Sequence, residues 1–144
     1  MNTAMDFTRF MFVIMSLLLL SCNKSDDSTA PIVVKPTLTS IQQEVFDKSC
    51  SSPSCHGGGA GGLVLTTGNS FNQLVNVRSQ NDGAHNPKFY RVLPNSPDSS
   101  FLYIKITNPN TSNQGTLMPR IGGKLSQDKL DAIRTWIANG ALNN

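Results

Sequence analysis

The hydrophobic and polar positions divide the chain into three parts. An apolar run extends from Phe10 to Leu20, and residues 23–38 are polar and punctuated by proline, with neither a helical nor a strand period. From residue 39 onward, short stretches place apolar residues three and four positions apart, which is the spacing of amphipathic helices. No alternating pattern of useful length is present. We therefore expect one all-α domain over residues 39–144, with about four short helices and long loops.

Signals for the start of a helix occur at four places, each followed by apolar residues at helical spacing. The four predicted starts are Ser40, Ser70, Ser96 with Pro97 at the first helical position, and Ser126. The first predicted helix runs directly into Cys50. The last ends at Asn139-Gly140, a pair typical of a left-handed C-terminal cap.

The first residues have the order of a secretory signal. Arg9 precedes the apolar run, which is too short to cross a bilayer as a helix, and small Ser21 precedes Cys22. The sequence Leu19-Leu20-Ser21-Cys22 resembles the bacterial lipobox. The resemblance implies that residues 1–21 are a lipoprotein signal peptide, that Cys22 is lipidated, and that residues 22–38 form a flexible linker. We expect an exported protein, lipid-anchored to a bacterial membrane and facing the periplasm or the cell surface.

Charge and cysteine content narrow the range of functions. Twelve Lys and Arg against nine Asp and Glu give a formal charge of +3, and the basic residues are scattered, which argues against nucleic-acid binding. The chain has three cysteines. If lipid takes Cys22, the remaining two, Cys50 and Cys55, are a pair in an oxidising compartment.

The segment from Cys50 to His56 contains the candidate chemistry. Two thiols at short range can add to the two vinyl groups of one haem, and a histidine directly after the second thiol is then held beneath the iron as a ligand. The glycines that follow, Gly57 to Gly62, suit either close backbone approach to a macrocycle or a flexible loop. They are no phosphate cradle, because no strand precedes them.

With these residues the chain resembles the mono-haem c-type cytochromes of class I, especially domains of bacterial lipoproteins whose motif continues as Cys-His-Gly-Gly. The likeness covers most of residues 40–142. Besides the motif, it includes the Arg91–Ser100 segment, Leu117-Met118-Pro119, and a final helix with Trp136-Ile137 and Gly140-Ala141. The resemblance implies one covalently bound haem c, with the first and last helices crossing near one haem edge.

The resemblance also implies the roles of four residues. Cys50 and Cys55 are the thioether sites, His56 is the proximal iron ligand and Met118 is the distal iron ligand. One feature departs from the usual motif, since four residues separate the cysteines here instead of two. The intervening Ser51-Ser52-Pro53-Ser54 is small and prone to form turns, which suits a loop that leaves both sulfurs facing one side.

Other residues near the motif have two interpretations each. Met118 is the only methionine outside the signal segment and lies in a loop. His85 competes as an axial ligand, but its polar, turn-forming neighbours favour a surface position. Arg91, beside Tyr90, is a candidate partner for a haem propionate, with an exposed arginine as the alternative. We expect Trp136 to lie in the core where the helices cross.

These expectations describe an electron carrier and not an enzyme, with redox proteins and the membrane as partners and no small-molecule substrate. Two other classes remain open. One is a haem enzyme or gas sensor whose sixth ligand position is open. The other is a haem-free interaction module in which a disulfide joins Cys50 and Cys55. A zinc site from these cysteines, His56 and His85 is disfavoured because it lacks the paired spacing of zinc modules.

Overall fold

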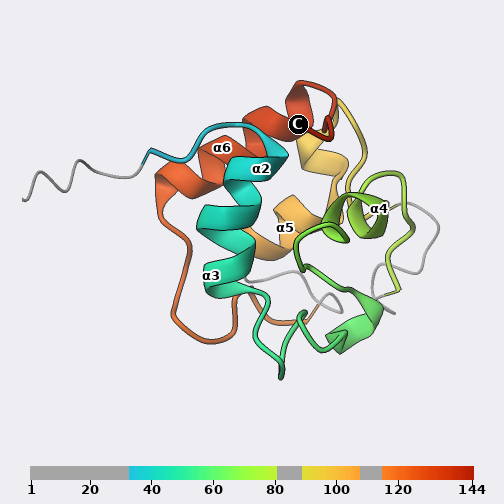
Figure 1. Ribbon diagram of the computed structural model, residues 1–144. Coiled ribbons are helices and arrows are strands. Elements are labelled where there is room, and N and C mark those ends of the chain that lie inside the picture. Colours follow the sequence, from blue (N-terminus) through green and yellow to red (C-terminus); the bar gives the residue numbers. More distant parts are fainter. Residues whose placement is uncertain (1–32, 81–88, 108–114) are drawn as a thin grey trace, which may run out of the picture. The chain divides into compact units, whose positions relative to one another are not determined.

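The chain divides into two units, Met1–Ile32 and Val33–Asn144. The structure, a computed structural model, describes residues 33–80, 89–107 and 115–144, all within the second unit (Figure 1). The predicted signal peptide, the lipidation site Cys22 and the competing ligand His85 lie outside the described residues. Within the described ranges, no helix is long and apolar enough to cross a membrane.

The described residues form short helices and a few isolated β-bridges, without an extended strand, which confirms the all-α class. The bridges join Val75 to Val92, and Tyr90 to both Arg78 and Ser100. In chain order the helices are α2 (Leu38–Ile41), the π-helix η1 (Gln42–Phe46), α3 (Asp47–Ser49), the 3-10 helix η2 (Ala60–Gly62), α4 (Ser70–Leu74), the 3-10 helix η4 (Pro97–Ser99), α5 (Phe101–Thr107) and α6 (Gln127–Ala138).

The first helical segment combines α2, η1 and α3 without a break. It begins earlier than the sequence predicts, because the Thr37 side chain, and not Ser40, caps it by accepting a hydrogen bond from the Ser40 amide. Val34 and Leu38, which the sequence assigns to the linker, are buried in the core. The packed chain therefore extends several residues into the polar segment.

The second and third predicted helix starts also differ in detail. Ser70 lies inside α4, and its buried hydroxyl donates to Gln42 Oε1 at 2.6 Å instead of capping the helix. Gln42 in turn donates to the Asp47 carboxylate and the Leu65 carbonyl, so its amide is satisfied within the fold. The predicted third helix is split: Pro97 opens the short η4, and α5 begins only at Phe101.

The last helix agrees with its prediction. Ser126 is the N-cap residue of α6, and Gly140, with φ of 96°, follows its C-cap Asn139. Its apolar stripe, including Ile133, Trp136 and Ile137, is buried against the first helical segment and α5. The Trp136 indole donates to the Leu142 carbonyl at 2.8 Å, which satisfies its one donor. Trp136 is thus a core residue, as expected.

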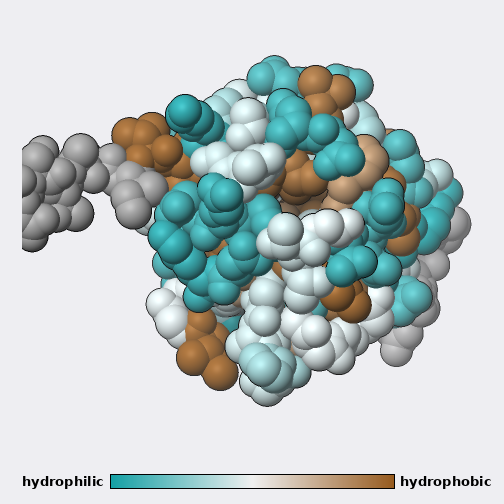
Figure 2. Space-filling view, viewed as in Figure 1, coloured by the Kyte–Doolittle hydropathy of each residue, from teal (hydrophilic) through white to brown (hydrophobic). Residues whose placement is uncertain are grey.

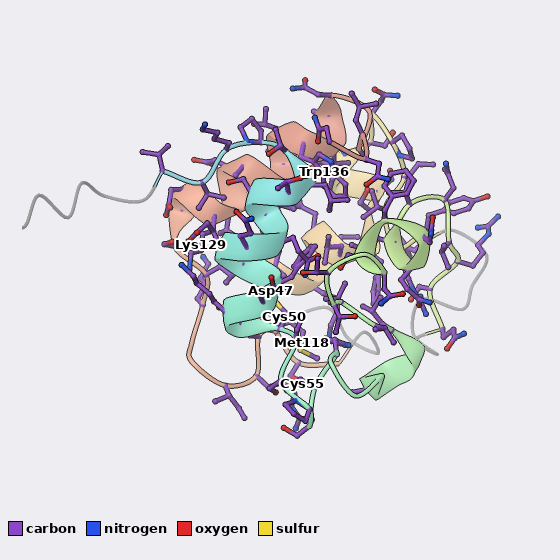
Figure 3. All side chains as sticks on the ribbon, viewed as in Figure 1. Asp47, Cys50, Cys55, Met118, Lys129 and Trp136 are labelled. Carbon is purple, nitrogen blue, oxygen red and sulfur yellow. The ribbon has the colours of Figure 1, made fainter. Side chains whose placement is uncertain are left out.

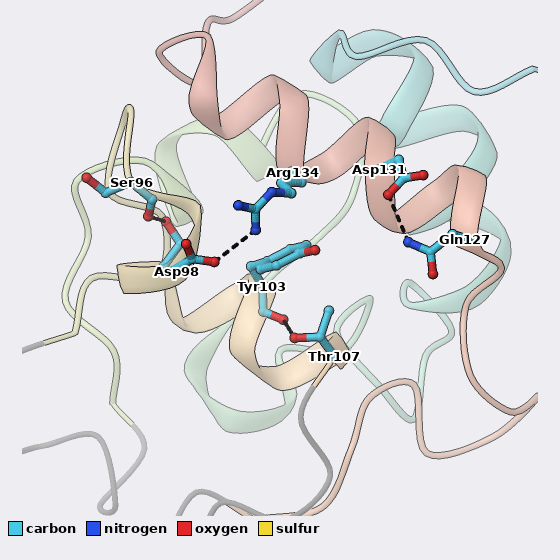
Figure 4. Close-up of polar contacts among 8 residues, drawn as sticks. Ser96, Asp98, Tyr103, Thr107, Gln127, Asp131 and Arg134 are labelled. Carbon is cyan, nitrogen blue, oxygen red and sulfur yellow. Dashed lines mark hydrogen bonds and ion pairs between the residues drawn. The ribbon is translucent and has the colours of Figure 1, made fainter.

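The exposed side of α6 is tied to the preceding elements by polar contacts (Figure 4). Arg134 donates to the Asp98 carboxylate of η4 at 2.9 Å, and its guanidinium lies 5.6 Å from the centre of the Tyr103 ring of α5. Both groups of this ion pair are exposed to solvent, so the pair contributes little to stability.

The C-terminal end of the described unit lies beside the start of α2 (Figure 1). The Thr39 amide donates to the Asn144 carbonyl at 2.8 Å, and the Leu38 amide donates to Asn144 Oδ1 at 3.0 Å. Asn144 therefore satisfies amides at the start of a helix that would otherwise lack partners. Cys50 lies at the opposite end of that helical segment.

Candidate functional site

Cys50 stands where the first helical segment ends. It is the C-cap of α3, its amide donates to the Phe46 carbonyl at 2.9 Å, and its side chain is partly buried against the core. Burial, together with the nearby Cys55, raises the pKa of the Cys50 thiol to about 11, against a smaller opposing effect of Lys129. Cys50 and Cys55 are both free thiols. Although four residues separate them in sequence, both cysteines line one cavity.

Hydrogen bonds close the loop between the cysteines. The His56 amide donates to the Cys50 carbonyl at 3.0 Å, and the Cys55 amide donates to the Ser52 carbonyl at 2.9 Å. The loop therefore turns back on itself. It brings the backbone of His56, which follows Cys55 in sequence, next to Cys50 at the end of α3. This is the compact path that the turn-forming residues 51–54 suggest.

The glycines after His56 are needed by this loop. A Cβ atom on Gly57 would lie 2.1 Å from the Ser51 carbonyl oxygen, and one on Gly58 would lie 2.0 Å from the Pro53 carbonyl oxygen. Both distances are far below van der Waals contact, and both neighbours are backbone atoms. The sequence suggests close approach of these glycines to a macrocycle or a flexible loop, whereas the structure shows close approach to the inter-cysteine loop itself.

The hydrogen bond of His56 defines its tautomer. Nδ1 lies 2.9 Å from the Ala60 carbonyl oxygen. A carbonyl oxygen can only accept, so Nδ1 carries the proton, and in the neutral ring Nε2 keeps its lone pair. Fixing one ring nitrogen on a backbone carbonyl in this way also fixes the ring plane, which is how proteins orient a histidine that ligates a metal.

Two cavities meet at His56 and Met118. The smaller, of about 210 Å³, is lined by the apolar side chains Leu63, Leu65, Leu74, Phe101 and Leu102 and by the polar Ser79, Gln80, Arg91 and Lys105. The larger, of about 680 Å³, contains Cys50, Cys55 and residues 119–122 in its wall. His56, Gly61 and Met118 line both. Figure 3 shows Cys50, Cys55 and Met118 together beyond the end of α3.

Met118 is held in place through its backbone. Its amide donates to the carbonyl of Lys105 in α5 at 2.8 Å, and its side chain is partly buried against the core. The thioether thus lines the cavities from a loop anchored to a helix, on a segment remote in sequence from His56. The structure brings together the four residues Cys50, Cys55, His56 and Met118.

Arg91 is buried and not exposed, with 6% of its surface accessible. Its guanidinium donates to the Gln73 carbonyl at 2.9 Å and to the Gly62 carbonyl at 2.7 Å. Within the described chain no carboxylate forms an ion pair with it. Burial lowers the Arg91 pKa. This cation lines the smaller cavity, and no carboxylate in the described part of the chain compensates it. Its neighbour Tyr90 lines neither cavity and stacks beneath Arg78 at 4.1 Å.

Sequence reasoning missed Lys105 as a residue of the site. It lines the smaller cavity from α5, where burial, and then the charge of Arg120, lowers its pKa. The signal was present in the spacing, because Lys105 lies three and four positions after Leu102 and Phe101 and so shares their helix face. From the sequence alone, a lysine next to apolar helix positions is readily interpreted as a solvent-exposed residue at the edge of the apolar stripe.

Comparison with protein-family models, curated proteins and solved structures found no match for this chain. Within the described ranges, no cluster of three or more His, Cys, Asp or Glu side chains is arranged to hold a metal ion.

Proposed function

We propose that this chain is a membrane-tethered mono-haem c-type cytochrome that transfers single electrons between redox partners. The observation that carries the proposal is the position of His56 and Met118 in the walls of the same two cavities, with Nδ1 of His56 held by the Ala60 carbonyl. An imidazole and a thioether are an axial ligand pair of electron-transfer haems, and the thioether raises the reduction potential.

The lining of the cavities fits haem c as a cofactor. Leucine and phenylalanine side chains offer apolar contact to a macrocycle, and Cys50 and Cys55 offer free thiols for thioether bonds. The buried charge of Arg91 has no carboxylate partner among the described residues, and a propionate would compensate it. Each chemical part of the cofactor thus has a counterpart in the chain.

The chain's residues have separate tasks in this proposal. Haem supplies a reversible one-electron change at its iron. Cys50 and Cys55 would hold it covalently, and His56 and Met118 would be its two iron ligands, which would leave no site at the iron for a substrate. Arg91, whose guanidinium is held by the Gln73 and Gly62 carbonyls, would place its positive charge at the wall of the smaller cavity, where a propionate could lie. Lipid on Cys22 would restrict the protein to a membrane surface, where its redox partners would be met.

The visible spectrum of the full chain, produced with c-type haem attachment machinery, tests this proposal. We expect a red protein with sharp bands on reduction, whose haem resists extraction by acidified organic solvent. A colourless protein, or haem that is extracted, would contradict covalent attachment and favour the Cys50–Cys55 disulfide of a haem-free module.

Variants of the two axial ligands test the assignments separately. Met118→Ala should keep the haem but lose the weak red absorption of a sulfur–iron bond, and it should bind carbon monoxide when reduced. Leu117→Ala, next to it but outside both cavity walls, is the matched control and should keep that band. His56→Ala should greatly reduce the yield of haem-bearing protein. Carbon monoxide binding to the unaltered protein would instead indicate an open sixth position.

A further inference from the structure

One residue of α5, Lys105, holds the loop that carries Met118 by two hydrogen bonds. Its backbone carbonyl accepts from the Met118 amide at 2.8 Å, and its side-chain ammonium group donates to the Thr116 carbonyl. The two contacts lie on either side of Leu117. The main chain and the side chain of a single lysine therefore fix the backbone at both ends of this three-residue stretch.

These two contacts are the hydrogen-bonded connection between the loop and the domain. Between residues 115 and 124, no other hydrogen bond or ion pair joins the described loop to another part of the described chain. The loop has no regular secondary structure that could hold it instead. Its place relative to α5 thus depends on Lys105.

Packing adds little support to this loop. Of residues 115–124, Met118 is the one whose side chain packs against the hydrophobic core, and Ile121 has 77% of its surface accessible. Figure 2 shows exposed hydrophobic side chains as separate spots among hydrophilic and neutral ones on the visible face. A methionine side chain has three rotatable bonds, so its packing alone does not determine where the sulfur lies. The backbone of the loop has to do so.

The helix that carries Lys105 is itself firmly placed. Phe101 and Ile106 of α5 are buried. The amides of Phe101 and Leu102 donate to the carbonyls of Tyr90 and Arg91, both at 2.9 Å. The start of α5 is therefore joined to the segment that contributes Arg91 to the smaller cavity, and Lys105 transmits this fixed position to the loop.

The ammonium group of Lys105 is in a setting that strengthens its contact with the loop. The side chain is half-buried and lines the smaller cavity together with Met118. A half-buried ammonium group has lost part of its water and needs acceptors in its place, and the Thr116 carbonyl supplies one. A hydrogen bond from a charged donor is also stronger than one between neutral groups.

We propose that Lys105 is a positioning residue, whose ammonium group holds the Thr116 carbonyl and so keeps the Met118 thioether in place to ligate the haem iron. This inference rests on the proposed function, in which Met118 is the distal ligand. Lys105 acts through the loop and is not itself an iron ligand. Without its ammonium group the loop would move away more often, and the thioether would leave the iron while Cys50 and Cys55 keep the haem attached.

Replacement of Lys105 by leucine tests the proposal in the full chain with haem attached. Lys105→Leu keeps an apolar, helix-forming side chain and the backbone carbonyl, but it removes the ammonium group. Imidazole added to the oxidised protein replaces the methionine sulfur, and the loss of the weak red absorption gives the rate. We expect Lys105→Leu to raise this rate about threefold to tenfold, and Lys105→Arg, which restores a charged donor, to recover most of the original rate.

Lys124→Leu is the matched control, because it makes the same exchange at an exposed lysine of the same loop that does not bond to Thr116. It should leave the rate unchanged. An unaltered rate in Lys105→Leu would overturn the proposal. An equal increase in Lys124→Leu would also overturn it, since the loss of positive charge would then be the cause.

A second measurement on the haem-free chain is independent of iron ligation. Hydrogen exchange of the backbone amides of residues 116–118, followed by NMR, should be about threefold to tenfold faster in Lys105→Leu, with the amides of α6 unchanged. If the amides of α6 accelerate by the same factor, Lys105 contributes only to global stability and the proposal is wrong. A colourless protein would refute the proposed function, whereas unchanged exchange at residues 116–118 would refute the role of Lys105 alone.

Discussion

Burial changes the acid–base behaviour of side chains beside the cavities, among them Cys50 and Arg91. For each of them burial disfavours the charged form, which raises the pKa of the thiol and lowers that of the guanidinium. Only Arg91 must nevertheless stay charged, since a guanidinium does not lose its proton in proteins. The two residues therefore affect stability in different ways.

The free Cys50 thiol makes stability depend on pH. Its pKa is about 11 in the folded chain against an ordinary 9.0, so between these values the unfolded state releases a proton that the folded state keeps. The contribution, about 3 kcal/mol, is fully present below pH 9 and is lost as pH rises to about 11. Urea unfolding of the haem-free protein at pH 8, 10 and 11 measures it. Cys50→Ala should lack this part of the slope, and an equal slope in both proteins would contradict the burial of the thiol.

Replacing Arg91 by lysine keeps the charge but removes the fork of donors. A single ammonium cannot serve the Gln73 and Gly62 carbonyls in the same geometry, so we expect Arg91→Lys to destabilise the protein by about 1–3 kcal/mol. Thermal unfolding measures the loss. Arg120→Lys, the same exchange at an exposed arginine, should change the melting temperature little. Equal effects of the two exchanges would show that the two carbonyls do not depend on the fork.

At the scale of elements, the loop from Cys50 to Gly62 shows how backbone contacts determine residue type. Gly57 takes no positive φ in the structure, so only space explains its need for glycine. At Gly61 the reverse holds, because a Cβ there meets nothing within 4 Å but φ is 65°. The same residue type thus serves two physical purposes within five positions of one loop.

This difference predicts unequal effects of alanine. Gly57→Ala should displace the Ser51 carbonyl, open the inter-cysteine loop and cost about 3 kcal/mol or more. Gly61→Ala should cost about 1 kcal/mol, the strain of a left-handed conformation alone. Denaturant unfolding compares the two variants. If Gly61→Ala were the more destabilising, the contact with Ser51 would not be the reason for glycine at position 57.

The sequence predicts the elements whose determinants are local. The stripe and caps of α6 follow from spacing and residue type, and so does the entry of a helix into Cys50. The function of a serine hydroxyl is not local: Ser70 donates to Gln42, 28 positions away. Similarly, the burial of Arg91 depends on carbonyls of two other loops, which no pattern around residue 91 encodes. The local motif singles out Cys50, Cys55 and His56, and the family resemblance adds Met118 as a candidate ligand, whereas the cavity walls contributed by α5 require the fold.

At the scale of the whole molecule, the last described residue, Asn144, is hydrogen-bonded to the start of the first helical segment. Asn144→Ala would remove the acceptor of the Leu38 amide while leaving the backbone bond to Thr39, and we expect a loss of about 1 kcal/mol. Its neighbour Asn143, exposed and without this bond, gives the control Asn143→Ala. Chemical unfolding distinguishes them, and equal stability of the two variants would contradict a capping role for Asn144.

The straight path of the chain from Leu38 to Ser49 also has a mechanical consequence. At about 1.5 Å per residue this segment is roughly 18 Å long, with Val33 near one end and Cys50 at the other. The segment therefore separates Val33, near its first residue, from Cys50, at its last. A support attached at Val33 itself would hold this unit by the end of the segment remote from Cys50. If the proposed function holds, immobilisation at Val33 should leave the cavity at Cys50 and Cys55 accessible.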